Sequence, residues 1–183
     1  VSAYDRGSLC FTETLKVGTL RTLDQVHGTY SSSAINYYTS MLIDNAFSEL
    51  HSISENLKAE IIIAMGTSAR TLLKLIRGNR SNKAAVCISR TEFFLLRSAV
   101  SDLTYEQISE QYGLAPDLAE MVQPCCMILD NLLRLTDAEK ILIPMVSTKY
   151  LLLRDFIDKT FGVPDRFEEQ VHSLIMRTAA RYR

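Results

Sequence analysis

A short apolar run that ends in a glycine and leads directly into a helical pattern constrains the fold most. Residues 60–65 read Glu-Ile-Ile-Ile-Ala-Met, and Gly66, Thr67 and Ser68 separate them from the helical spacing of 69–76. Consecutive apolar, β-branched residues are typical of a strand that is covered on both faces. A strand, a small-residue turn and a helix in immediate succession predict an α/β fold.

Strand and helix patterns alternate along the rest of the chain. A hairpin tip at 5–7 precedes a strand over 9–15, and further strands are predicted over 85–88 and 141–146, where Pro144 indicates the end of a strand or an edge strand. Helical spacing covers 19–26, 34–57, 93–100, 103–112, 115–135 with a kink at Pro124, 148–161 and 166–182. Strands separated by helices favour a predominantly parallel sheet.

Charge and composition exclude several classes of function. The chain has 20 Lys and Arg against 21 Asp and Glu, so its overall charge does not attract nucleic acid. Residues 103–122 imitate a helix-turn-helix, but the would-be recognition helix at 117–122 carries two acids and no base, which disfavours DNA binding. No apolar run reaches the ~18 residues of a membrane helix.

The cysteines and histidines form no recognisable metal or catalytic set. Cys10, Cys87, Cys125 and Cys126 lack the Cys-x-x-Cys spacing of a zinc site, so buried, reduced thiols of a cytoplasmic protein are expected. The three histidines are scattered along the chain, at His27, His51 and His172. We therefore assign no catalytic residue and no metal ligand within the chain.

Gly66, Thr67 and Ser68 are the candidate phosphate-binding residues. A helix that starts directly after a strand presents free backbone N–H groups and its positive end at the carboxyl edge of the sheet, where ligands of α/β proteins bind. Gly66 allows close backbone approach, and the two hydroxyls add donors. A Gly-Thr-Ser turn that merely caps its helix remains the alternative.

Five stretches, taken in chain order, resemble the Ppx/GppA phosphatase family and together span nearly the whole chain. The stretch 14–21 resembles the family's Ser-Leu-x-Leu-Gly-x-x-Arg segment, 63–69 its Gly-Gly-Thr-Ala turn, and 119–124 its Ala-Asp-x-Ile-x-Pro-Gly helix. Residues 88–116 contain segments similar to its helical insertion, and 146–155 is similar to its closing strand and Leu-Arg-Glu-Gly helix.

This resemblance implies a fold and an activity. It implies the second lobe of a ribonuclease-H-like, actin-like ATPase fold over 1–162, with a mixed sheet flanked by helices and a helical insertion, and a linker with the first helix of a C-terminal domain over 163–183. The family hydrolyses the terminal phosphoanhydride of inorganic polyphosphate or guanosine pentaphosphate with Mg²⁺, and its long members pair as homodimers. On this resemblance Gly66, Thr67 and Ser68 face the cleft between two lobes.

The resemblance also implies that the chain is one piece of a longer protein. The first lobe, with its catalytic glutamate, and the Asp-x-Gly-Gly-Gly-Ser loop are expected before Val1, so the fragment alone is expected to be inactive. Met65, Leu118, Cys125 and Phe156 replace residues of the family's motifs. A non-catalytic nucleotide or polyphosphate sensor of the same fold is therefore the alternative to a phosphatase, and a helical protein-interaction domain without a ligand is a third reading.

Overall fold

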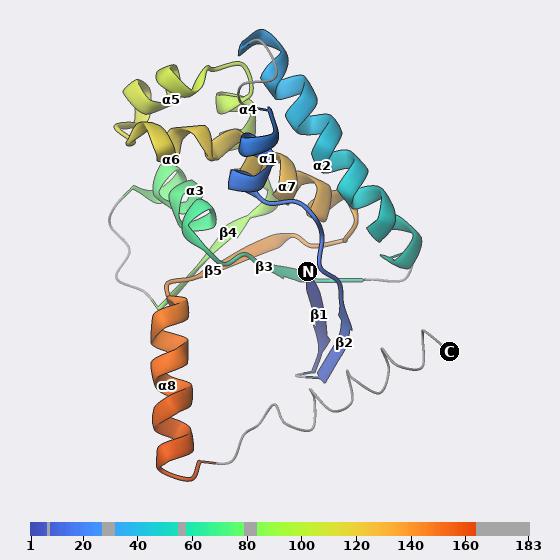
Figure 1. The fold of residues 1–183 in the computed structure, drawn as a ribbon, viewed down its shortest axis with the longest axis vertical. Coiled ribbons are helices and arrows are strands. Elements are labelled where there is room, and N and C mark those ends of the chain that lie inside the picture. Colours follow the sequence, from blue (N-terminus) through green and yellow to red (C-terminus); the bar gives the residue numbers. More distant parts are fainter. Residues whose placement is uncertain (7, 27–31, 55–57, 79–83, 164–183) are drawn as a thin grey trace. The chain divides into compact units, whose positions relative to one another are not determined.

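The computed structural model describes residues 1–6, 8–26, 32–54, 58–78 and 84–163 (Figure 1). The chain divides into two compact units, of which one comprises 15–145 and the other comprises 1–14 together with 146–183. The predicted helix over 166–182 lies outside the described residues.

The larger unit, 15–145, alternates strands with helices, as its sequence predicts. Its elements are α1 (Thr19–Val26), α2 (Ser32–Ser54), β3 (Ile61–Ile63), α3 (Thr67–Arg77), β4 (Ala85–Ser89), α4 (Arg90–Val100), α5 (Tyr105–Tyr112), α6 (Pro116–Glu120), α7 (Val122–Arg134) and β5 (Lys140–Pro144). The predicted helix over 19–26 is confirmed at both ends. The segment 27–33 between the first two predicted helices is predicted to be a loop, but α2 begins within it, at Ser32, and residues 27–31 lie outside the described residues. Residues 55–57 of the helix predicted over 34–57 also lie outside them.

The described strands of this unit form a three-stranded sheet in the order β3-β5-β4. Strand β5 runs parallel to β3 and antiparallel to β4, so the prediction of a predominantly parallel sheet is wrong and the sheet is mixed. Alternating strands and helices predict that two strands run parallel only where a single helix connects strands that are neighbours in the sheet. Here β5 is inserted between β3 and β4, and Pro144 ends a central strand rather than marking an edge.

One face of the sheet is buried and the other is exposed. Ile88, Ile141 and Ile143 are fully buried, whereas Ile61 and Ile63 are 48% and 62% exposed. Side chains of a strand alternate between the two faces, so the register of the three strands places the buried isoleucines on the same face. The expectation that the strand over 60–65 is covered on both faces is therefore wrong for the described residues.

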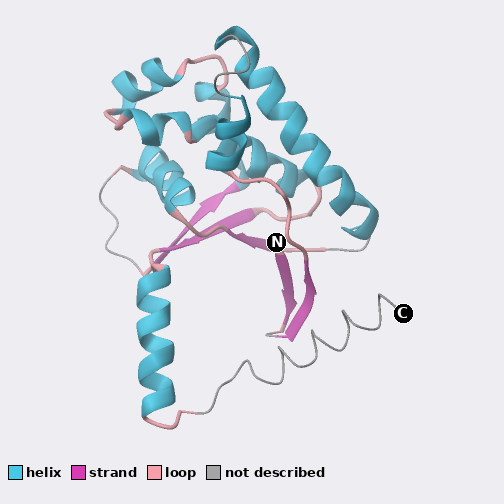
Figure 2. Ribbon diagram, viewed as in Figure 1, coloured by secondary structure: helices cyan, strands magenta, loops and turns pink. Residues whose placement is uncertain are grey.

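The helices of this unit gather over the buried face of the sheet (Figures 1 and 2). Helices α3, α4 and α7 contribute to one continuous apolar core. Its largest fully buried members come from these helices, from α5 and from the sheet, and are Leu72, Ile88, Phe93, Val100, Ile108, Leu133, Ile141 and Ile143. A buried side chain of this size contributes about 1.5–3 kcal/mol through the apolar area that it removes from water.

Helix α2 packs against both α1 and α7. Its buried side chains, Ile43, Phe47 and Leu50, recur at helical spacing. The Asn131 amide of α7 donates a hydrogen bond of 3.0 Å to the Asp44 carboxylate of α2, which fixes the two helices in register at the edge of their contact.

The break between α6 and α7 lies at Met121 and not at the predicted kink, Pro124. Pro124 is the third residue of α7, within the first turn, where a backbone N–H has no partner inside the helix. The proline therefore costs the helix no hydrogen bond. Met121 closes α6 with helical dihedrals and its carbonyl accepts from the Cys125 amide at 3.1 Å.

Individual residues define the start of α4 and the end of α5. The Ser89 hydroxyl accepts from the Glu92 amide at 3.2 Å and the Glu92 carboxylate accepts from the Ser89 amide at 2.9 Å, so the two residues form the capping box that the Ser-x-x-Glu spacing of 89–92 indicates. Glu92 also pairs with Arg77 of α3 at 2.6 Å. Gly113 ends α5 in the left-handed conformation, with φ 62°, as its position predicts.

The smaller unit contains a hairpin and a helix. Strands β1 (Ser2–Asp5) and β2 (Ser8–Thr12) pair antiparallel, which confirms the predicted hairpin, although Gly7 of its tip lies outside the described residues. Helix α8 (Thr148–Thr160) begins at the Ser147 hydroxyl, which accepts from the Tyr150 amide at 3.2 Å. None of the described helices has the length and hydropathy required to cross a membrane.

We predict that Gln123→Ala destabilises the protein. The Gln123 side-chain amide donates to the carbonyls of Val100 and Leu103, both at 2.8 Å, and so holds the turn between α4 and α5. Its loss leaves these carbonyls without that donor, at an expected cost of about 1–3 kcal/mol in the free energy of unfolding measured with urea. Gln111→Ala, at an exposed position of α5, is the control and should cost less than ~0.5 kcal/mol. Equal effects of the two variants would refute the role of Gln123.

A second prediction concerns the buried carboxylate of α7. One oxygen of Asp130 accepts from Arg97 at 3.0 Å and from Arg134 at 2.8 Å, and only 4% of its side chain is exposed. Asp130→Asn keeps the shape and removes the charge, so we expect a loss of roughly 1–3 kcal/mol in urea unfolding. Asp158→Asn removes the exposed pair with Arg154 and should change stability by less than ~0.5 kcal/mol. An Asp130→Asn variant as stable as the parent chain would contradict a structural role for the ion pairs of Asp130 with Arg97 and Arg134.

Candidate functional site

The turn between β3 and α3 contains the three predicted site residues. The Ala64 amide donates to the Leu142 carbonyl at 2.9 Å, so the pairing of β3 with β5 continues to within two residues of Gly66. Gly66 then precedes the first residue of α3 with φ 113° and ψ 177°. Only glycine adopts this combination without strain. Apart from its two neighbours in the chain, no described residue has a heavy atom within 4 Å of the position that a Cβ would take, so the backbone angle, and not a close contact, requires glycine here.

Helix α3 starts without a side-chain cap. Its first bond to the preceding turn runs from the Arg70 amide to the Gly66 carbonyl at 3.2 Å. The amides of Thr67, Ser68 and Ala69 have no acceptor in the described part of the chain. Three unpaired donors at the positive end of a helix form an environment that favours a negative charge.

The two predicted hydroxyls differ in their surroundings. The Ser68 hydroxyl lies 2.9 Å from the Thr19 hydroxyl and donates to the sulfur of Met121 at 3.6 Å. A hydroxyl has one proton, so when Ser68 donates to Met121, Thr19 is the donor to Ser68. Thr67 is exposed, and its hydroxyl has no hydrogen-bond partner among the described residues. Thr67 is therefore the hydroxyl that is free to meet a ligand.

The hydrogen bond between Thr19 and Ser68 joins the starts of two helices. Thr19 is the first residue of α1, and the Thr22 amide of that helix bonds back to the Gly18 carbonyl at 2.8 Å. The first turns of α1 and α3 therefore lie next to each other. Thr19 was not among the residues predicted for the site. The only signal for it in the sequence is a glycine before a threonine at a helix start, which Gly18-Thr19 shares with Gly66-Thr67.

Both helix starts carry arginine where acidic residues are favoured. Neither α1 nor α3 has an acid in its first turn, and Arg21 and Arg70 stand close to the two starts. Neither arginine forms an ion pair with a described residue. A cation near a helix N-terminus opposes the helix dipole, so this charge arrangement costs stability unless an anion is present.

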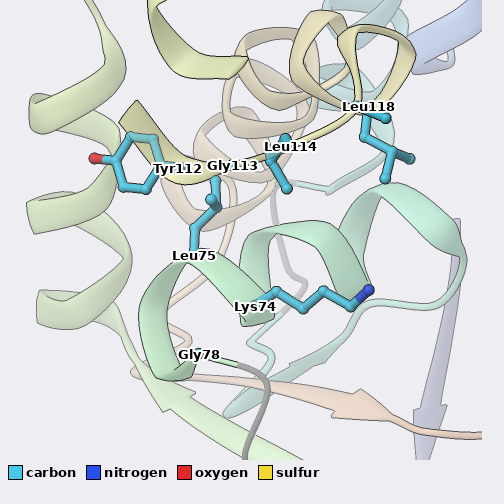
Figure 3. A pocket seen from close by; sticks show the side chains of 8 residues that line it. Lys74, Leu75, Gly78, Tyr112, Gly113, Leu114 and Leu118 are labelled. Atoms are coloured by element: carbon cyan, nitrogen blue, oxygen red, sulfur yellow. The ribbon is translucent and has the colours of Figure 1, made fainter. Parts of the chain in front are cut away.

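A cavity of about 250 Å³ lies at the opposite end of α3, between its last turns and the turn from α5 to α6 (Figure 3). It is lined by Lys74, Leu75, Gly78, Tyr112, Gly113, Leu114, Ala115 and Leu118. Lys74 lies seven positions after Thr67, which is about 10 Å along a helix. With one charged side chain and no carboxylate, histidine or cysteine, the lining offers no catalytic set.

The thiols divide into two classes, so the expectation that all four are buried is wrong. Cys125 and Cys126 are buried in α7, whereas Cys10 of β2 and Cys87 of β4 are exposed. Cys87 shares the exposed sheet face with Ile61 and Ile63, where alternation places it. Burial raises the pKa of the Cys126 thiol to about 12 and also raises the pKa of Cys125, so neither is a nucleophile near neutral pH.

The described residues contain no group of three or more His, Cys, Asp or Glu side chains that could hold a metal ion. His51 lies in α2, and His27 and His172 lie outside the described residues. The turn from β3 to α3 offers amides and one free hydroxyl but no carboxylate, and Mg²⁺ prefers oxygen ligands that include carboxylates. These residues alone do not form a magnesium site.

Comparison of the folds relates the chain to solved phosphatase structures. An exopolyphosphatase from Cytophaga hutchinsonii superposes with a TM-score of 0.68 over 85% of this chain, at 17% sequence identity. A Ppx/GppA family member from Aquifex aeolicus gives 0.66 over 86% of the chain, at 9% identity. The chain has the Ppx/GppA fold. The fold class predicted from the sequence, a ribonuclease-H-like, actin-like lobe with a mixed sheet and flanking helices, is thereby confirmed.

The similarity has two limits that bear on function. The chain spans about half the length of the solved structures it matches, 52% in both cases. No family model and no curated protein matches its sequence. At 9–17% identity the comparison establishes the fold alone, because one fold can carry different activities.

We predict that Gly66→Ala is destabilising because an alanine at φ 113° is strained. The expected cost is about 1–3 kcal/mol in urea unfolding. Gly18→Ala is the matched control, since its added methyl group also meets no atom within 4 Å but its φ lies outside the left-handed region. That variant should stay within ~0.5 kcal/mol of the parent chain. A Gly66→Ala variant as stable as the parent chain would contradict the positive φ of Gly66 in this turn.

We also predict that two of the four thiols react with Ellman's reagent in the folded protein at pH 8. Cys10 and Cys87 should react quickly, while Cys125 and Cys126 should react only after unfolding, because they are buried and protonated. Cys87→Ser should reduce the fast count to one. Fast reaction of all four thiols in native buffer would contradict the burial of Cys125 and Cys126 in α7.

Proposed function

We propose that this chain forms one wall of the phosphate-binding cleft of a phosphatase that acts on the terminal phosphoanhydride of inorganic polyphosphate or guanosine pentaphosphate. The observation that carries the proposal is the pair of helix starts, α1 and α3, joined by the hydrogen bond between Thr19 and Ser68. Both lack an acid in the first turn, and α3 leaves three amides without an acceptor in the described chain. The similarity of fold to an exopolyphosphatase supports the same class of ligand.

Each residue of the turn has a role in this proposal. Gly66 sets the backbone angle that directs the amides of Thr67 and Ser68, and the free Thr67 hydroxyl adds a donor. Ser68 and Thr19 act as positioning residues, because their hydroxyls hold the two helix starts together. Arg21 and Arg70 add positive charge. Fixed donors aimed at phosphate oxygens stabilise the charge that develops during phosphoryl transfer.

The chain supplies binding and not the chemical step. Hydrolysis of a phosphoanhydride needs a group that orients or deprotonates the attacking water. No described side chain of the turn has that capacity, and the described residues contain no group of three or more His, Cys, Asp or Glu side chains that could hold a metal ion. The proposal therefore leaves the water-activating group and the metal to the other lobe of a longer protein. The boundaries suggested by the sequence, 1–162 for the lobe and 163–183 for the lead into a further domain, belong to this proposal.

The binding step can be tested with the isolated chain labelled with ¹⁵N. We expect tripolyphosphate to shift the amide signals of Gly66, Thr67 and Ser68, with a strong dependence on salt, because the attraction is electrostatic. Arg70→Gln should weaken binding roughly two- to fivefold, as for an exposed charge pair of up to ~1 kcal/mol. Lys74→Gln, on the same helix but near its other end, is the control and should have a smaller effect.

Two results would overturn the binding proposal. If millimolar tripolyphosphate leaves the amide signals of residues 66–68 unchanged, this turn is not a phosphate-binding site. Equal weakening by Arg70→Gln and Lys74→Gln would show a general charge effect rather than a site at the start of α3. Thr67→Val provides a further check, because it removes the free hydroxyl and keeps the shape of the side chain.

A separate assay of activity tests whether this chain supplies phosphate binding alone and another lobe supplies the chemical step. The chain alone, supplied with Mg²⁺ and polyphosphate, should release no phosphate, and measurable turnover would contradict the proposed absence of a catalytic group. The full-length parent should release phosphate from polyphosphate or from guanosine pentaphosphate. Binding without turnover by the parent would instead favour a nucleotide or polyphosphate sensor of the same fold.

A further inference from the structure

We draw no further inference here: the strongest candidate, the outer face of the β3–β5–β4 sheet where Ile61 and Ile63 are exposed, is an unpartnered apolar face, and nothing in the structure shows what covers it.

Discussion

Strand β5 holds the larger unit together, because it is the central strand of the sheet and its inner face is completely buried. Ile141 and Ile143 are both 0% exposed, and each contributes about 1.5–3 kcal/mol by leaving water. Both β3 and β4 hydrogen-bond to this strand alone among the described strands. The pairing with β3 reaches Ala64, so the position of the turn at Gly66 depends on the same strand. The candidate site is thus anchored by the sheet that the apolar core fixes.

The helix starts of the candidate site differ in charge from those of α4 and α5, and α2 and α7, which also lack an acid in the first turn, carry no arginine there. Helices α4 and α5 start with capping boxes and carry Glu92 and Glu106 in their first turns, as helix dipoles favour. At α1 and α3 the acids are absent and arginines stand in their place. Natural sequences tend to depart from such local preferences at functional sites. The contrast between the two pairs of helices within one unit supports the proposed binding of an anion at α1 and α3.

Several features were predictable because they depend on neighbours in the sequence. Gly113 ends α5, and Ser89 and Glu92 cap α4. A glycine after a helical pattern and a Ser-x-x-Glu spacing before one indicate these helix ends from local sequence alone. The limits of α1 also follow from its pattern. Pro124 misled the prediction because a proline breaks a helix only when its missing N–H or its ring disturbs a preceding turn, and here α7 starts just before it.

The sequence by itself determined the order of strands and helices, the capping box of α4, the glycine that ends α5, the glycine turn after β3 and the resemblance that anticipated the fold. These depend on side-chain spacing and on backbone preferences that act within a few residues. Tertiary structure decided the antiparallel direction of β4, the exposure of Ile61, Ile63 and Cys87, and the meeting of Thr19 with Ser68. Each of these depends on which distant segments pack together. Thr19 and Ser68 are 49 positions apart in the sequence, and no local pattern specifies their contact.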